Sequence, residues 1–425
     1  MKASFYEVDI TPPIGGYMWG QYVKVIAEDV ADRLHAKALV VEDGGNIAAM
    51  VAIDACVLPP ELHDIVTKRI YEYTGISPDC VSINATHTHK GFPIIDSPEL
   101  KCYGDASYKD VCYRLIADAV ILAYKRLDDE EVEVSYGTGI AKEVGYIRDA
   151  ELDDGTYVTQ LRGRKNIVRF LGGIDESVNV LTFSKGGKKI GSIVNYSCHL
   201  DSVGARRAYS ADYAGVVSKI LKEKYGNDFV CLFLTGACGN VGHTNPDENI
   251  PKSNYLGMGA IVGEEAIRVI ENSEPVHGTV SVCKELVKIE KRELDDDAMD
   301  RYIDRETGKL KLDLFFLKNY LMYKNTNEGT HAELYFQVIK IGDVAIALLP
   351  GEIYAAIGLA IKEKSPYKRT IIAELSNSYC GYIPLKELYG DNCMLYESMA
   401  CHHSCLREDA SDIVEEKALE LLNRV

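Results

Sequence analysis

The chain contains 425 residues, of which 47% are hydrophobic and 26% are charged, and this ordinary mixture excludes a largely disordered protein. Its 64 acidic residues outnumber its 47 basic residues, and the resulting net charge of −17 argues against nucleic acid as a partner. The length suits one large α/β domain or two modest ones.

The chain also lacks the sequence features of an exported or membrane-inserted protein. Its first residues contain no apolar stretch typical of a signal peptide, and the longest apolar runs, such as 344–349, have the length of a strand. Twelve cysteines are scattered without a CxxC pair, as expected for reduced and mostly buried thiols. We therefore expect a cytoplasmic protein without stable membrane insertion, whose oligomeric state stays open.

Strand-like and helix-like segments alternate along the first half of the chain. Residues 37–42 and 47–53 predict a hairpin over the turn dipeptide Gly44-Gly45. A helical pattern begins after Pro59-Pro60 and ends at Gly75, which is the usual placement of proline and glycine at helix ends. The next expected elements are a buried strand over 80–85, a helix over 108–126, and a strand pair over 178–184 and 190–196.

The same alternation continues in the second half. Asp212 is expected to cap a helix over 213–225, which precedes an apolar strand over 229–234. The remaining expected elements are a helix over 255–271, a hairpin over 332–339 and 343–349, a helix from Glu352 to Lys364, a strand over 370–375 and an amphipathic helix over about 409–423.

Together these elements predict an α/β fold with mixed β-sheets and flanking helices, organised as a single large domain over residues 1–425. No internal repeat and no low-complexity tract is visible in the sequence. The most polar segment, 286–330, is the best candidate for an insertion or a subdomain.

The first candidate site is the segment 84–91, which reads NATHTHKG and follows the strand expected over 80–85. Sites of α/β proteins commonly lie at the carboxyl ends of strands. In an extended chain the side chains of His87 and His89 lie on the same side, so both can reach one ion. A chain with ten histidines also contains such a pair by chance, so the spacing alone does not establish a site.

Two other polar residues end strands in the same way. His199 follows the strand 190–196 and fits either a metal ligand or a hydrogen-bonded structural histidine. Glu352 follows an apolar strand, where its carboxylate fits a ligand or an acid/base group, or equally a helix N-terminal residue that complements the helix dipole.

Three further segments have both a functional and a plain structural interpretation. Tyrosines cluster over 377–397, but tyrosine is abundant throughout this chain, with 27 residues against 9 phenylalanines. The segment 235–240 resembles a phosphate-binding turn but lacks the Walker spacing and lysine, which favours a tight turn near the site. Arg206-Arg207 is expected to be a solvated pair.

In their order along the chain, these motifs resemble the N-terminal catalytic domain of the neutral, non-lysosomal ceramidase family. The resemblance covers nearly the whole chain, and the order of its pieces is more specific than any one of them. The pieces are DITPPIG (9–15), NATHTHKG (84–91), NYSCH (195–199), ADYAG (211–215), TGACGNV (235–241), PGE (350–352), the NSYCGY to YE region (377–397) and the EEKALELL helix (415–422).

The resemblance implies a zinc ion held by His87, His199, Glu352 and Tyr382, where Tyr382 is the second tyrosine of the N-x-Y-x-x-Y pattern. It also implies three catalytic residues: His89 as the proton-transferring histidine, Tyr396 as the tyrosine that steadies the tetrahedral intermediate, and Arg148 as the matching arginine. The local match at Arg148 is poor, and the family position alternatively falls on Ile147.

Such a residue set has a coherent chemistry. Two histidines and a glutamate form a catalytic zinc set that leaves a position for water, and the ion lowers the pKa of water and polarises an amide carbonyl. A histidine then moves the proton from water to the leaving amine, while tyrosine and arginine hold the developing oxyanion. The expected function is zinc-dependent hydrolysis of an N-acyl amide.

The chain departs from the family in three ways. We expect a short form without a signal peptide and without the C-terminal immunoglobulin-like domain of the family, and the small residues that usually follow YE are replaced by SMACHHSC (398–405). The pair Cys401 and Cys405 with the histidines between them fits a second soft-metal site or, with more weight, a loop of unpaired thiols. These differences leave the ceramide substrate open, so a smaller soluble N-acyl compound is an equal candidate.

Three alternatives differ in class from this expectation. A metal hydrolase of an ester or lactone would use the same residues, and a non-catalytic binding protein would keep the fold but usually lose a ligand. A cysteine hydrolase built on Cys198 and His199 is disfavoured because adjacent residues of a strand point to opposite faces.

Overall fold

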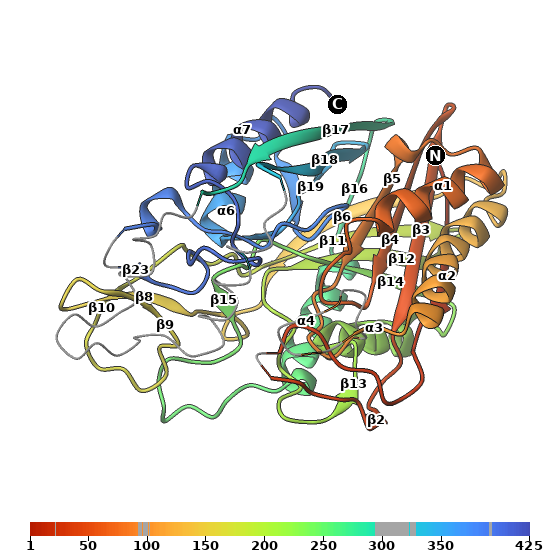
Figure 1. Ribbon diagram of the computed structural model, residues 1–425. Coiled ribbons are helices and arrows are strands. Elements are labelled where there is room, and N and C mark those ends of the chain that lie inside the picture. The colour runs from red at the N-terminus through yellow and green to blue at the C-terminus, as the bar shows by residue number, and fades with distance from the viewer. Residues whose placement is uncertain are drawn as a thin grey trace.

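The computed structural model describes residues 1–21, 23–91, 96, 101, 103–293, 323, 329–390 and 393–425. Within them, three units repeat one order of elements: three antiparallel strands, a helix, a fourth strand parallel to the third, and a second helix. The three sheets enclose a common core, and the helices lie outside them (Figure 1).

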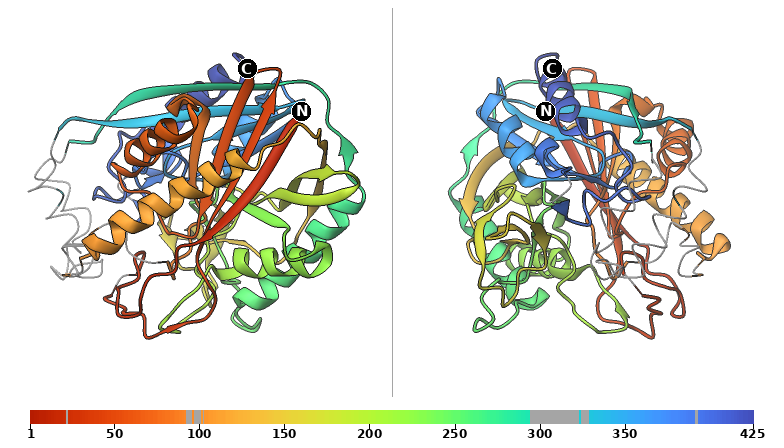
Figure 2. Two further views of the ribbon diagram at one scale, coloured as in Figure 1. Left: turned by 90° about the vertical axis from the view of Figure 1, so that its right-hand side faces the viewer. Right: turned by 60° about the vertical axis from the view of Figure 1, so that its left-hand side comes forward.

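The first unit is N-terminal. Its sheet has the order β1-β3-β4-β5, and its helices cover the outer face, where Figure 2 shows both of them crossing the red strands. The elements are β1 (Lys2–Asp9), β3 (His35–Asp43), β4 (Asn46–Ile53), α1 (Leu62–Thr74), β5 (Val81–Ala85) and α2 (Ala106–Lys125), with the 3-10 turn η1 (Pro78–Cys80) before β5.

The second unit has the strand order β14-β12-β11-β6, with the short β16 beside β6. Its elements are β6 (Glu133–Ile140), β11 (Ser177–Lys185), β12 (Lys188–Tyr196), α3 (Asp212–Tyr225), β14 (Val230–Thr235), α4 (Tyr255–Glu271) and β16 (Glu274–Pro275).

The third unit has the order β17-β18-β19-β21. Its elements are β17 (Val280–Glu290), β18 (His331–Ile341), β19 (Val344–Leu348), α6 (Ala355–Lys364), β21 (Arg369–Ala373) and α7 (Ala410–Leu422).

The core explains why these strands read as continuous apolar runs. One face of every sheet packs into the shared central core and the opposite face packs under that unit's helices, so neighbouring residues on a strand are both buried. Such inner and outer pairs are Met50 and Val51, Ile193 and Val194, and Ile346 and Ala347.

The expected hairpins are confirmed, and they are the second and third strands of each unit. β3 pairs with β4, β11 with β12, and β18 with β19, all antiparallel. Glycines occupy each turn at positive φ, for example Gly44 at 57° and Gly45 at 88°, which is what a two-residue hairpin requires. The repetition is invisible in the sequence because the three units share backbone geometry rather than side chains.

Short strand pairings join loops within the second and third units and between units. These are β2 (Asp29–Val30) with β13 (Ala208–Tyr209), β7 (Tyr146–Ile147) with β15 (Val241–Gly242), β20 (Glu352–Ile353) with β22 (Tyr382–Ile383), and a small sheet of β8 (Asp149–Leu152), β9 (Tyr157–Thr159), β10 (Ile167–Phe170) and β23 (Cys393–Met394); the turn η4 (Lys386–Leu388) follows β22.

Two sequence-based boundaries are corrected. The helix expected from Glu352 begins at Ala355, because Glu352 is held in the extended pair β20–β22. Asp212 is the first residue of α3 rather than its cap, and its carboxylate accepts from the backbone N–H groups of Ser202 and Tyr213.

The polar segment 286–330 lies mostly outside the described residues. Its beginning, 286–290, is the end of β17, and Tyr323 packs into the core of the third unit. None of the helices in the described part of the chain has the length and apolar character needed to cross a membrane.

Candidate metal centre

The candidate site lies where the third and fourth strands of the three units end. His87 follows β5 of the first unit, His199 follows β12 of the second, and Glu352 follows β19 of the third. The fold therefore brings together residues that are more than 100 positions apart, and all three side chains are buried.

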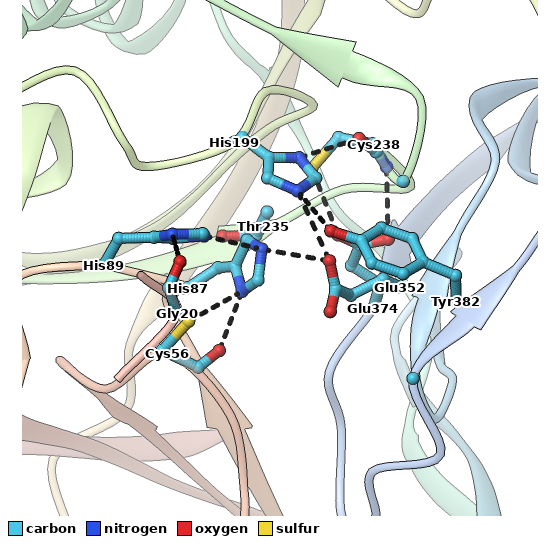
Figure 3. Close-up of polar contacts among 12 residues, drawn as sticks. Gly20, Cys56, His87, His89, His199, Thr235, Cys238, Glu352, Glu374 and Tyr382 are labelled. Carbon is cyan, nitrogen blue, oxygen red and sulfur yellow. Dashed lines mark hydrogen bonds and ion pairs between the residues drawn. The ribbon is translucent and has the colours of Figure 1, made fainter. Parts of the chain in front are cut away.

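The donor atoms of these residues converge on one point (Figure 3). Glu352 Oε2 lies 3.3 Å from His87 Nε2 and 3.3 Å from His199 Nε2. Ligands held at about 2.0 Å by a tetrahedral zinc ion lie about 3.3 Å from one another, so this spacing fits such an ion. Glu352 Oε2 is buried and has no hydrogen-bond partner among the described residues, as expected for an atom reserved for a metal.

Backbone carbonyls fix the orientation of both imidazoles. His87 Nδ1 lies 2.8 Å from the carbonyl oxygen of Cys56, and His199 Nδ1 lies 2.9 Å from that of Cys238. A carbonyl oxygen only accepts, so each Nδ1 carries the proton and each Nε2 presents a lone pair to the centre. Sequence reasoning missed these contacts because a backbone carbonyl has no residue signature.

The carboxylate of Glu352 is oriented by Tyr379, whose hydroxyl donates to Oε1 at 3.0 Å. Burial alone would raise the pKa of Glu352, but the positive charge that His87 and His199 carry in their protonated forms holds it well below its usual range. Glu352 is therefore an anion with one oxygen tied to Tyr379 and the other directed at the histidines. Tyr379 is the first tyrosine of the N-x-Y-x-x-Y pattern, to which the sequence analysis assigned no role.

Tyr382 completes the ring of donors. The parallel pair β20–β22 places it opposite Glu352, and its hydroxyl lies 3.3 Å from His199 Nε2. The close approach of these strands needs Gly351, whose φ is 80° and whose hypothetical Cβ would lie 2.7 Å from the carbonyl oxygen of Gly381. A hydroxyl at this position is suited to become a fourth ligand.

A second layer ties the ligand-bearing loops together. Glu374, fully buried after β21, accepts from the backbone N–H groups of Cys238 and Ile353, at 3.1 and 2.7 Å. Burial raises the pKa of Glu374 to about 8. It joins the loop that orients His199 to the loop that carries Glu352, a role that no motif around Glu374 indicates.

His89 lies at the edge of the centre. Its Nε2 is 3.4 Å from His87 Nε2, and its Nδ1 lies 2.9 Å from the carbonyl oxygen of Gly20. The Gly20 carbonyl therefore sets the tautomer of His89 and leaves a lone pair on Nε2, beside the metal position. No feature of the Gly20 segment indicated this contact in the sequence.

We expect Gly20→Ala to displace the His89 imidazole and to leave the candidate ligands His87, His199 and Glu352 in place. A Cβ at Gly20 would lie 2.8 Å from His89 Nδ1 and 2.9 Å from Cys56 Sγ, so the imidazole must shift. A displacement of about 1 Å in a catalytic group costs on the order of 100-fold in rate. Steady-state hydrolysis kinetics and metal content of the variant would measure both effects.

Gly45→Ala is the matched control. Gly45 has the same φ of 88° but nothing within 4 Å of its hypothetical Cβ. Both variants carry a backbone strain of about 1 kcal/mol, and only Gly20→Ala adds the clash with His89 and Cys56, so its unfolding temperature should fall further. Equal activity of both variants would contradict the role given to the Gly20 contact.

Arg148 and Tyr396 lie beside Tyr382, the candidate fourth ligand. The Tyr396 hydroxyl is 3.1 Å from that of Tyr382, and the Arg148 guanidinium lies 5.2 Å from the Tyr396 ring centroid and 5.5 Å from that of Tyr382. Ile147 instead pairs with Val241 between β7 and β15. The structure thus brings Arg148, and not its neighbour, to the candidate site.

Cys56 and the Cys401–Cys405 segment also lie near the candidate site. Cys56 forms a second potential ligand group with His87 and His89, but both Nδ1 atoms already face backbone carbonyls. The Cys401–Cys405 segment does adjoin the site, since the His403 ring contacts Tyr382 and Tyr396. Among the described residues, neither of its cysteines belongs to a group of three potential ligands.

The Cys198–His199 pair and the segment 235–240 both have a structural role in the fold. The Cys198 side chain is buried in the core under α3 and α4. It therefore does not share a site with the His199 imidazole, as a cysteine hydrolase would require. In the segment 235–240, Thr235 donates to the carbonyl oxygen of Thr86 and Asn240 accepts from the first N–H of α6. These hydrogen bonds connect the turn to the segment that carries His87 and to the start of α6.

Comparisons with known proteins agree with this architecture. Residues 6–259 match the family model described as neutral/alkaline non-lysosomal ceramidase, N-terminal. A neutral ceramidase from Drosophila pseudoobscura pseudoobscura is 25% identical over 281 residues, a match that covers 60% of this chain and 37% of that relative's length.

Solved structures show the same fold. The crystal structure of neutral ceramidase from Pseudomonas aeruginosa superposes with a TM-score of 0.75 at 18% identity, covering 100% of this chain and 75% of the other. A structure of a ceramidase complexed with C2 gives a TM-score of 0.75 at 17% identity, covering 99% and 74% of the two chains. These similarities confirm the expected mixed sheets with flanking helices.

Proposed function

The chain belongs to the neutral/alkaline non-lysosomal ceramidase family, and from this membership we propose that it is a zinc-dependent hydrolase of an N-acyl amide bond. The observation that carries the proposal is the convergence of His87 Nε2, His199 Nε2 and Glu352 Oε2 at tetrahedral spacing around one point. Tyr382 is the proposed fourth ligand, and the mixed nitrogen and oxygen donors suit zinc.

When bound, the ion supplies a Lewis acid that acidifies water and polarises the amide carbonyl. The protein residues supply the remaining steps. His89 accepts a proton at Nε2 from the attacking water and then donates it to the nitrogen of the leaving amine. The hydrogen bond from His89 Nδ1 to the Gly20 carbonyl keeps Nε2 available for both transfers.

Tyr396 and Arg148 are proposed to donate hydrogen bonds to the carbonyl oxygen as it becomes negative. Arg148 Nε is buried and has no acceptor in the described part of the chain. A buried donor without a partner costs free energy, which suits a group held ready for a substrate oxygen.

The proposed substrate is an N-acyl amide, either ceramide-like or smaller and soluble. An ester or lactone substrate would use the same groups, so substrate comparison separates these reactions. A non-catalytic binding protein is the remaining alternative, and the retention of all four proposed ligands weighs against it.

The test combines metal analysis with a substrate panel. Protein purified without tag or chelator should contain about one zinc ion per chain by plasma mass spectrometry and should release free amine from N-acyl amides, including a short-chain ceramide. Chelator treatment should abolish the reaction, and added zinc should restore it. Protein that binds no zinc after incubation with the ion would overturn the hydrolase mechanism and favour the binding protein.

A further inference from the structure

Glu397 is a buried acidic residue beside the candidate site to which no role has been given. It directly follows Tyr396, its side chain is 0% exposed, and its Oε1 lies 2.9 Å from Arg148 Nη2. Apart from this ion pair, neither carboxylate oxygen has a hydrogen-bond partner among the described residues. A buried carboxylate with only one partner is costly, so its presence calls for an explanation.

Among the described residues, Glu397 is the only ion-pair partner of the Arg148 guanidinium. Its Nη2 also donates to the carbonyl oxygen of Gly239 at 2.7 Å, and its faces lie against the rings of Tyr382 and Tyr396. The Arg148 side chain is 20% exposed, so it has an open direction in which to turn. Without a charged partner, a long arginine side chain in this position has the rotamer freedom to leave the tyrosines.

Asp149 adds a second buried carboxyl group to the same cluster. Its Oδ2 accepts from the Tyr354 hydroxyl at 2.6 Å, while its Oδ1 has no hydrogen-bond partner in the described residues. Burial raises the pKa of both carboxyl groups, and the charge of the Arg148 guanidinium opposes that shift in each. One guanidinium thus faces two carboxyl groups, and only Glu397 forms a direct ion pair with it.

We propose that Glu397 is a positioning residue that holds the Arg148 guanidinium beside Tyr396, in the orientation needed to contact the substrate carbonyl oxygen. The inference rests on the proposed function. It assigns to the glutamate of the YE pair a role exerted through Arg148 and not by contact with the substrate.

A double-mutant cycle on kcat distinguishes a positioning role of Glu397 from a purely structural one. If Glu397 acts only through Arg148, its removal matters when Arg148 is present and has little effect when Arg148 is absent. A residue that only supports the fold would instead lower activity by the same factor in both backgrounds.

The experiment compares wild type, Glu397→Gln, Arg148→Met and the double variant, with Glu397→Asp as the charge-preserving variant. Glu290→Gln is the control, because Glu290 forms an exposed ion pair with Arg407. We measure kcat and KM for amide hydrolysis, zinc content, and thermal unfolding for each protein.

We expect Glu397→Gln to lower kcat about 10- to 100-fold with a smaller change in KM, since the interaction it supports forms in the transition state. Glu397→Asp should recover part of kcat, and Glu397→Gln should change kcat less than about twofold in the Arg148→Met background. Equal factors in both backgrounds, or wild-type kcat in Glu397→Gln, would overturn the inference. If Glu397→Gln fails to fold, the Glu397→Asp cycle with Arg148→Met decides by the same criterion.

A binding measurement separates this inference from the proposed reaction. Octanoate presents a carboxylate that resembles the charged oxygen of the transition state, and its Kd can be measured by calorimetry in the same proteins. If the wild-type protein binds octanoate but hydrolyses no amide, only the proposed function is contradicted. The double-mutant cycle is then evaluated from the Kd values for octanoate in place of kcat. A wild-type protein that neither binds nor hydrolyses leaves Arg148 nothing to contact, and both proposals fail.

Discussion

Substitution of Glu352 by glutamine is expected to leave a folded protein that has lost its metal ion and its amide hydrolysis. The carboxylate is the only anionic side chain among the four proposed ligands, and its Oε2 lies 3.3 Å from both histidine nitrogens. A neutral amide of the same shape cannot balance a divalent charge in a buried site. Zinc content should fall from about one ion per chain to below about 0.1.

The accompanying loss of kcat/KM should be about 1,000-fold or more, because a catalytic metal contributes several kcal/mol to the transition state. Glu363→Gln is the control, since Glu363 is exposed on α6 a few residues further along the chain. Retention of one zinc ion per chain by Glu352→Gln would show that the ion, if present, is held elsewhere.

Substitution of His89 by asparagine is expected to separate chemistry from metal binding. His89 Nε2 lies 3.4 Å from His87 Nε2, beside the proposed ligands, and its Nδ1 faces the Gly20 carbonyl. Removing a general acid/base costs about 100- to 10,000-fold in kcat, whereas a residue outside the ligand set should not change metal content. Steady-state kinetics and plasma mass spectrometry on the same preparation test both parts.

Two companion variants make the His89 prediction sharper. His277→Asn removes an exposed histidine between β16 and β17 and should leave kcat unchanged. His89→Ala should regain part of its activity when imidazole is added, because the small molecule can supply the missing proton transfer. Loss of zinc in His89→Asn would instead identify His89 as a ligand and contradict its assignment to proton transfer.

The tertiary structure changes the interpretation of Glu352. As a sequence, PGE after an apolar strand fits a ligand or acid/base group and equally a helix N-terminus, and the structure shows Glu352 extended and paired with Tyr382 in β20–β22. The pairing requires Gly351, and it requires that the segment 377–383, from a later part of the chain, packs beside Glu352. Local propensity cannot report a contact whose partner lies 30 residues away.

The sequence by itself determined the strands and hairpins, because burial on both faces makes each strand an apolar run and glycine marks the turns. It also placed His87, His199 and Glu352 at strand ends, since polar residues that follow apolar runs are visible without a structure.

Only the tertiary structure decided the threefold repetition of the units, the carbonyl contacts from Gly20, Cys56 and Cys238, and the places of Glu374 and Glu397. The physical reason is common to all of them. Backbone carbonyls belong to every residue alike, and buried carboxyl groups acquire their partners only when distant loops pack together.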